Sequence, residues 1–236
     1  MILLDKFTNI QDELNITIGT FDAIHKGHLK IINKLTSFKE KNLVLSFFPP
    51  PFIFFKKESK VLFLPEEKKE ILSNYKINFL LSIPFDENIK ELEPNEFIEL
   101  LLNYLKIKRI LVGKNFKFGK DRKGNVEFLK RISNEKNIEL IVIEEEKFDG
   151  EKISSSKIRK LIQKGEIKKA NQFLTYPYFI KLENNLSINQ LKLIPPDGKY
   201  LVKFNDNETE VEILNQKIFI NNFQENAVIL YFIKKF

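Results

Sequence analysis

The chain has 236 residues, a net charge of +7 and 43% hydrophobic residues, which suits one large domain or a medium domain followed by a small one. It has no cysteine, which excludes disulfides, thiolate metal sites and a cysteine nucleophile. It also shows no long apolar run and no signal-peptide pattern, so we expect a cytoplasmic protein with no membrane span.

Short apolar segments alternate with helical patterns through the first three quarters of the chain. Strands are predicted at Asn15–Ile18, Leu43–Phe48, Phe79–Ile83, Arg109–Val112 and Ile138–Ile143. Helices are predicted at His28–Phe38, Pro65–Tyr75, Pro94–Leu105, Asn125–Glu135 and Ser155–Lys164. The alternation favours an α/β fold, a parallel sheet with helices on both faces. Ligands of such sheets bind at the carboxyl ends of the strands, where the strand order reverses.

The helical pattern stops after Pro177. Four short apolar runs follow, at residues 200–204, 210–214, 217–220 and 227–233, and polar turn sequences such as Asn205-Asp206-Asn207 and Asn221-Asn222 separate them. This predicts a small antiparallel β unit, which is too small to be very stable alone and is expected to pack on the first domain.

The positive charge is almost all lysine, mixed with glutamate in runs such as residues 66–70. This pattern indicates solvated helix faces rather than a basic stripe, so we predict no nucleic-acid partner. A mild positive excess also suits a polyphosphate substrate. The chain has four arginines, which makes each one more informative than any lysine: Arg109, Arg122, Arg131 and Arg159.

The chain's two histidines, His25 and His28, stand in one motif, G-T-F-D-A-I-H-K-G-H, at residues 19–28. The motif lies between a predicted strand and a predicted helix, and helix N-termini attract phosphate. Two imidazoles there could stabilise the charge that grows on a reacting phosphate. Two ordinary surface histidines are the alternative. The pair makes a poor metal site, because zinc normally takes three or four protein ligands, so we predict no metal site in the protein.

Three further segments carry candidate site residues. Residues 112–124 hold three of the eight glycines and follow a predicted strand, which indicates a ligand loop or else a flexible turn. Residues 153–159 place three serines and Arg159 at a predicted helix start, where they could bind phosphate or simply cap the helix. Residues 45–55 combine a strand end, three prolines and a dense phenylalanine cluster, which fits a wall for a flat ring system and a plain core equally well.

These four segments, in this order, resemble the bacterial FAD synthetase family, the bifunctional riboflavin kinase/FMN adenylyltransferases. The family patterns G-x-F-D-G-V-H-x-G-H, T-F-x-P-H-P, V-G-x-[DN]-F-x-F-G and I-S-S-T-x-I-R find counterparts at Gly19–His28, Ser46–Pro51, Val112–Gly119 and Ile153–Arg159. The resemblance covers residues 1–178 and implies a Rossmann-like nucleotidyltransferase domain there. The stretch at residues 165–174 resembles the helix that closes this module.

The chain departs from the family pattern at several positions. Ala23 replaces a glycine, Pro50 replaces a histidine, and Ser156 replaces a threonine while keeping the hydroxyl. No P-T-x-N segment, which the family uses for riboflavin kinase chemistry, occurs anywhere. Residues 179–236 therefore resemble a shortened β-rich remnant of the kinase domain, and we predict no riboflavin kinase activity.

The resemblance implies an FMN adenylyltransferase that transfers AMP from ATP to FMN, with Mg²⁺ arriving on ATP. The implied catalytic residues are His25, His28 and Arg159. The implied ATP-binding residues are Gly19, Phe21, Asp22, Gly27, Ser154, Ser155 and Ser156. The implied flavin-binding residues are Phe47, Phe48, Pro49, Asn115, Phe116 and Phe118. Two alternatives stay open: another small-molecule nucleotidyltransferase, and a non-catalytic flavin or nucleotide sensor.

Overall fold

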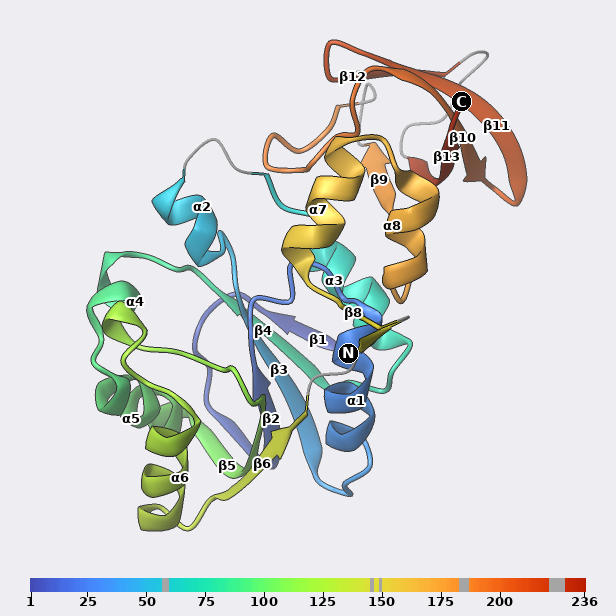
Figure 1. Ribbon diagram of the computed structural model, residues 1–236. Helices are drawn as coiled ribbons and strands as arrows, with labels where there is room; N and C mark the ends of the chain where they lie inside the picture. Colours follow the sequence, from blue (N-terminus) through green and yellow to red (C-terminus); the bar gives the residue numbers. More distant parts are fainter. Residues whose placement is uncertain (57–59, 145–146, 149, 183–186, 221–227) are drawn as a thin grey trace. The chain divides into compact units, whose positions relative to one another are not determined.

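The computed structural model describes residues 1–56, 60–144, 147–148, 150–182, 187–220 and 228–236 (Figure 1). Contacts divide the chain into two compact units. The first unit comprises Met1–Phe21, His28–Ser59 and Pro65–Glu146. The second comprises Asp22–Gly27, Lys60–Leu64 and Lys147–Phe236. The predicted boundary after residue 178 stays a prediction, although the compact units are divided elsewhere.

The first unit is built on a six-stranded parallel sheet, as the alternating pattern predicts. Its strands are β1 (Ile2–Leu4), β2 (Ile10–Ile18), β3 (Lys41–Phe47), β4 (Phe79–Ile83), β5 (Leu105–Gly113) and β6 (Glu139–Ile143). Their order is β1-β4-β3-β2-β5-β6, with every neighbouring pair parallel. The chain moves outward from β2 in one direction and then restarts on its other side with β5. The strand order therefore reverses between β2 and β5.

The predicted helices of this unit are confirmed, and further short helices accompany them. The helical segments are α1 (Lys26–Leu35), α2 (Pro51–Phe55), α3 (Pro65–Ser73), α4 (Glu87–Glu91), α5 (Pro94–Tyr104), the 3₁₀ turn η1 (Lys120–Arg122) and α6 (Val126–Glu135). Local chemistry sets where several begin. The Asn125 side chain accepts a hydrogen bond from Phe128 N at 2.9 Å, and Glu93 and Glu96 form a capping box ahead of α5. The two short helices α2 and α4 were not predicted.

A hydrophobic core fills the space between the sheet and helices α5 and α6. Alternate residues of the central strands point to this face, and so do apolar residues of both helices. The core includes Leu14, Ile16, Ile18, Leu43, Leu45, Ile110, Val112, Phe97, Leu101, Leu129 and Ile132. Helix α1 buries Ile32 and Leu35, and helix α3 buries Ile71 and Leu72. This layering leaves the carboxyl ends of the strands as the edge where a ligand could enter.

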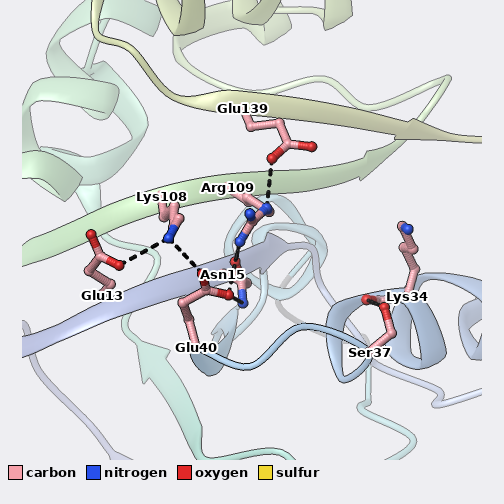
Figure 2. A network of polar contacts seen from close by, with 8 residues as sticks. All are labelled: Glu13, Asn15, Lys34, Ser37, Glu40, Lys108, Arg109 and Glu139. Atoms are coloured by element: carbon pink, nitrogen blue, oxygen red, sulfur yellow. Dashed lines mark hydrogen bonds and ion pairs between the residues drawn. The ribbon is translucent and has the colours of Figure 1, made fainter.

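An ion-pair network joins three strands of the sheet away from that edge (Figure 2). Arg109 on β5 donates to Glu139 at 2.6 Å, to Asn15 at 3.1 Å and to Glu40 at 2.9 Å. The Lys108 ammonium also donates to Glu40. These contacts lower the pKa of Glu40 to about 2, and the hydrogen bond from Lys108 is the largest cause. Arg109 therefore has a structural role, which its rarity alone did not reveal.

The second unit combines helices α7 (Ser155–Gln163) and α8 (Ile167–Phe173) with antiparallel strands. The strands β9 (Phe179–Leu182), β10 (Gly198–Phe204), β11 (Asn207–Leu214), β12 (Lys217–Ile220) and β13 (Val228–Lys235) pair in the order β12-β11-β10-β13-β9. A separate two-stranded ribbon joins β7 (Lys147–Phe148) to β8 (Glu151–Lys152). The small antiparallel β unit is thus confirmed, while β9 was not predicted. The predicted turn at Asn221-Asn222 and the start of the last run at Ala227 lie outside the described residues.

Apolar side chains of this sheet are largely buried. Tyr200, Val202 and Phe232 are fully buried, and the carbonyl of Phe232 accepts a hydrogen bond from Asn171 of α8 at 2.8 Å. Phe219 is an exception, because it is 50% exposed on strand β12 at one end of the sheet. In the described part of the chain, no helix is long and apolar enough to cross a membrane.

Candidate active site

A cavity of about 650 Å³ lies in the first unit at the reversal between β2 and β5. Ile18 and Gly19 at the end of β2, together with Thr20, line one part of it. The loop that follows β5 lines another part. The volume falls within the range of small-molecule pockets, and the position is the one expected for a ligand in an open α/β sheet.

Phenylalanine side chains from five parts of the chain line the cavity. They are Phe47, Phe52, Phe55, Phe85, Phe97, Phe116 and Phe118. The rings of Phe116 and Phe118 stack with centroids 5.4 Å apart and planes 16° apart, and Phe47 meets Phe85 edge-on at 5.7 Å. Phe118 and Phe97 also belong to the hydrophobic core, so the same aromatic residues serve as core and as cavity wall.

Three of the six predicted flavin residues line this cavity, namely Phe47, Phe116 and Phe118. Phe48, Pro49 and Asn115 are not among its described lining residues. Sequence reasoning did not assign the remaining wall residues to the site. For Phe52 and Phe55 the signal was present in the aromatic cluster, and Phe85 lies two residues after the end of strand β4.

The loop after β5 is anchored in place, which argues against a merely flexible turn. Phe118 and Gly124 exchange two backbone hydrogen bonds, of 3.1 and 3.0 Å. A Cβ added at Gly124 would lie 2.7 Å from the Phe118 ring, so a side chain there would push this ring out of position. The same loop brings Lys120 and Arg122 to the cavity, where Lys120 pairs with Glu91.

A buried lysine supports the first residues of the histidine motif. The carbonyl of Thr20 accepts hydrogen bonds from Ser46 Oγ at 2.7 Å and from Lys68 Nζ at 3.0 Å, and Lys68 also donates to Ser46 Oγ at 3.0 Å. Lys68 and its neighbour Glu67 are each 1% exposed. The prediction that the run at residues 66–70 forms a solvated helix face is therefore wrong for these two residues. The hydrogen bonds to Thr20 and Ser46 compensate for burying the Lys68 ammonium.

The motif continues with Phe21 and His28 in the first unit. Phe21 has a φ of 45°, a left-handed conformation that is rare for a bulky residue and often marks a functional site. Its ring lies 4.7 Å from the His28 ring, centroid to centroid. Helix α1 begins at Lys26, so His28 lies in the first helical turn, as predicted.

His25 belongs to the second unit and is held neutral by its surroundings. Its side chain is 7% exposed, and burial lowers its pKa from 6.5 to about 4. A Cβ added at Gly27 would lie 3.2 Å from Cε1 and Nδ1 of His25, so glycine leaves room for the imidazole to approach the backbone closely. At neutral pH this imidazole can donate one hydrogen bond without adding a charge.

The segment at residues 153–159 packs against the same part of the motif within the second unit. Ser154 caps α7 by accepting a hydrogen bond from Lys157 N at 3.2 Å, and Ser155 Oγ accepts one from Ala23 N at 3.3 Å. Ser156 is exposed. Arg159 Nη2 forms an ion pair with Oδ2 of the buried Asp22. The structure therefore shows a capping contact for Ser154, a contact with the motif for Ser155, and an ion pair with Asp22 for Arg159.

A Rossmann-like parallel sheet with a G-x-F-D-x-x-H-x-G-H motif at its strand reversal defines a class of protein, the nucleotidyltransferases. Comparison with known proteins narrows the class. The family model described as FAD synthetase matches residues 7–157. The chain belongs to the FAD synthetase family.

Individual relatives agree with this assignment. A bifunctional riboflavin kinase/FMN adenylyltransferase of Buchnera aphidicola subsp. Schizaphis graminum is 34% identical over 173 residues, which are 70% of this chain and 55% of that protein. An FAD synthetase of Listeria monocytogenes is 33% identical over 171 residues, which are 70% of each chain. The chain thus spans about half the length of the Buchnera relative.

One solved structure resembles the whole chain in fold. A macrolide-efflux protein from Streptococcus pneumoniae matches with a TM-score of 0.84 and 20% sequence identity, over 100% of this chain and 91% of that one. At this identity the match shows the fold alone.

Proposed function

We propose that this protein is an FMN adenylyltransferase, which transfers AMP from ATP to FMN and releases pyrophosphate. The observation that carries the proposal is the phenylalanine-lined cavity at the reversal between β2 and β5, in a chain of the FAD synthetase family. Aromatic side chains suit a flat ring system, because offset and edge-on ring contacts add to the free energy of apolar burial.

In this proposal the cavity holds the isoalloxazine ring of FMN. Phe47, Phe116 and Phe118 contact the ring, with Phe52, Phe55 and Phe85 completing the wall. The proposed roles of Phe48, Pro49 and Asn115 rest on the family resemblance. Arg122 lies at the same cavity and offers a planar fork to the FMN phosphate.

The histidine motif and α7 are proposed to bind the ATP phosphates. His25 and His28 would donate to α- and β-phosphate oxygens, and Ser154, Ser155, Ser156 and Arg159 would bind the departing phosphates. The remaining ATP-binding candidates are Gly19, Phe21, Asp22 and Gly27. Asp22 contributes through its ion pair with Arg159.

The chemistry needs positioning more than covalent participation. An FMN phosphate oxygen attacks the α-phosphorus, and the bond from that phosphorus to the bridging oxygen breaks as pyrophosphate leaves. Mg²⁺ would reach the site on the ATP phosphates and neutralise their charge. The described residues include no cluster of three or more His, Cys, Asp or Glu that could hold a metal.

Product analysis tests the proposal against its alternatives. The purified protein is incubated with ATP, Mg²⁺ and either FMN or phosphopantetheine, and FAD, dephospho-coenzyme A and pyrophosphate are separated by chromatography. FAD and pyrophosphate in equal amounts are expected from FMN. Product from phosphopantetheine alone would indicate another nucleotidyltransferase. Tight binding of FMN or ATP without any turnover would indicate a sensor.

A further inference from the structure

A buried path of polar contacts in the second unit connects Lys192 to Arg159. Lys192 Nζ donates to the carbonyl of Leu62 at 2.7 Å, and the N–H of Leu62 donates to Asp22 Oδ1 at 3.0 Å. Asp22 Oδ2 accepts from Arg159 Nη2. Lys192, Leu62 and Asp22 are 2%, 0% and 1% exposed, so water cannot readily replace these contacts.

Lys192 itself is held tightly. Its ammonium lies 4.7 Å from the ring centroid of Phe63, 4.9 Å from that of Tyr178 and 5.2 Å from that of Phe179. Such contacts between a cation and aromatic faces strengthen where water is excluded. The ammonium therefore presents its hydrogen bond to Leu62 from a nearly fixed position.

The backbone around Leu62 is also joined to the residues flanking Lys192. Val61 N donates to the carbonyl of Leu191 at 2.7 Å, and Leu193 N donates to the carbonyl of Val61 at 2.8 Å. Leu62 is thus held by its neighbours' backbone and by its own carbonyl. These contacts fix the direction of the Leu62 N–H, which points at Asp22.

This arrangement decides what Asp22 can do for Arg159. With Oδ1 occupied by Leu62 N–H, the carboxylate is fixed with Oδ2 facing the guanidinium. A carboxylate that could rotate would hold the planar fork of Arg159 in several orientations, and phosphate recognition by a fork depends on one orientation. Small displacements of a positioning group can cost large factors in rate.

We propose that Lys192 is a positioning residue for Arg159 and acts through Leu62 and Asp22. Residues from the C-terminal quarter of the chain would then contribute to ATP binding, in addition to forming a sheet. The inference rests on the proposed function, because it assigns Arg159 to the departing phosphates.

The test compares two lysine variants. Lys192→Met keeps an unbranched side chain among the aromatic rings but cannot donate to Leu62. Lys235→Met is the matched control, because Lys235 also donates to a backbone carbonyl, that of Asp197 at 2.8 Å, and also lies over a tyrosine ring, at 5.5 Å from Tyr200. The rate of FAD formation is measured against ATP and FMN concentration, in the wild-type and the Arg159→Ala background.

Lys192→Met is expected to lower kcat/KM for ATP about tenfold and to leave KM for FMN unchanged, whereas Lys235→Met changes neither. In the Arg159→Ala background the same Lys192 substitution is expected to lower kcat/KM for ATP by less than about twofold. The reason is that the effect of Lys192 passes through the guanidinium, which this background lacks. If Lys192→Met folds poorly, Lys192→Arg provides the second variant. It retains a cationic donor and is expected to keep most of the wild-type rate.

Several results would overturn the proposal. An equal loss in both Arg159 backgrounds would show that Lys192 acts independently of Arg159, and an equal loss in Lys235→Met would show general destabilisation. A protein that makes no FAD at all would count against the proposed function instead. The link itself is then decided by unfolding, where Lys192→Met and Asp22→Asn must show non-additive effects on the free energy of unfolding, and additive effects would refute it.

Discussion

Burial of His25 makes the protein's stability depend on pH in a calculable way. The pKa of this imidazole is about 4 in the folded protein and about 6.5 in an unfolded chain. As the pH falls through this interval, His25 therefore binds a proton in the unfolded state but not in the folded state. Stability is fully retained above pH 6.5 and declines between about pH 6.5 and pH 4. A shift of this size corresponds to about 3 kcal/mol of unfolding free energy lost by pH 4.

The comparison of wild type with His25→Gln isolates this effect, since glutamine is similarly polar but does not titrate. Urea unfolding is followed at intervals from pH 7.5 to pH 4, and the wild-type free energy is expected to fall relative to the variant by about 3 kcal/mol. Because the chain has two histidines, NMR titration of the imidazole signals gives an independent reading, assigned with His28→Gln. A difference between wild type and variant that stays constant with pH would refute the argument. So would an NMR pKa near 6.5 for His25.

Four further outcomes are expected. A folded His28→Ala variant should lose roughly 10²–10³ in turnover of FMN to FAD, as other losses of a donor to developing charge do, and near-normal turnover would remove His28 from catalysis. Arg159→Lys should raise KM for ATP and lower turnover, because lysine cannot keep both the Asp22 contact and a fork toward phosphate; unchanged kinetics would make Arg159 purely structural. Lys68→Met should lower the free energy of unfolding by about 1–3 kcal/mol, whereas Lys69→Met, at a neighbour whose side chain is 41% exposed, should have little effect in the same urea titration. With riboflavin, ATP and Mg²⁺ the protein should form neither FMN nor FAD, and formation at a rate comparable with that from supplied FMN would contradict the kinase-remnant interpretation.

Local sequence patterns predicted the sheet, because its strands can be recognised from the residues within them. The strand Phe79–Ile83 is apolar at every position except Ser82 and is found with the same bounds. The strand beginning at Asn15 was predicted too short, because the polar residues Gln11, Asp12 and Glu13 hide the start of β2 at Ile10. Strand β9 was missed because its partner β13 lies far along the chain.

The candidate site could be predicted from the sequence only in part. Motifs that follow strands were found, since parallel strands bring such segments to one edge. Lys68 and Lys192 could not be found, because a buried lysine looks like a solvated one until the carbonyl that receives its hydrogen bond is known. Their acceptors, Thr20 and Leu62, are 48 and 130 residues away in sequence.

The division of the chain into two compact units has a consequence for its modularity. The chain passes from one unit to the other five times, at residues 21–22, 27–28, 59–60, 64–65 and 146–147. No single cut separates the units, since any fragment that begins at residue 1 and contains most of the first unit also carries the motif segment 22–27 of the second. The C-terminal sheet therefore cannot be exchanged as a cassette. A replacement would have to supply a surface for α8 and partners for residues 60–64, or it would disturb the segment that carries His25.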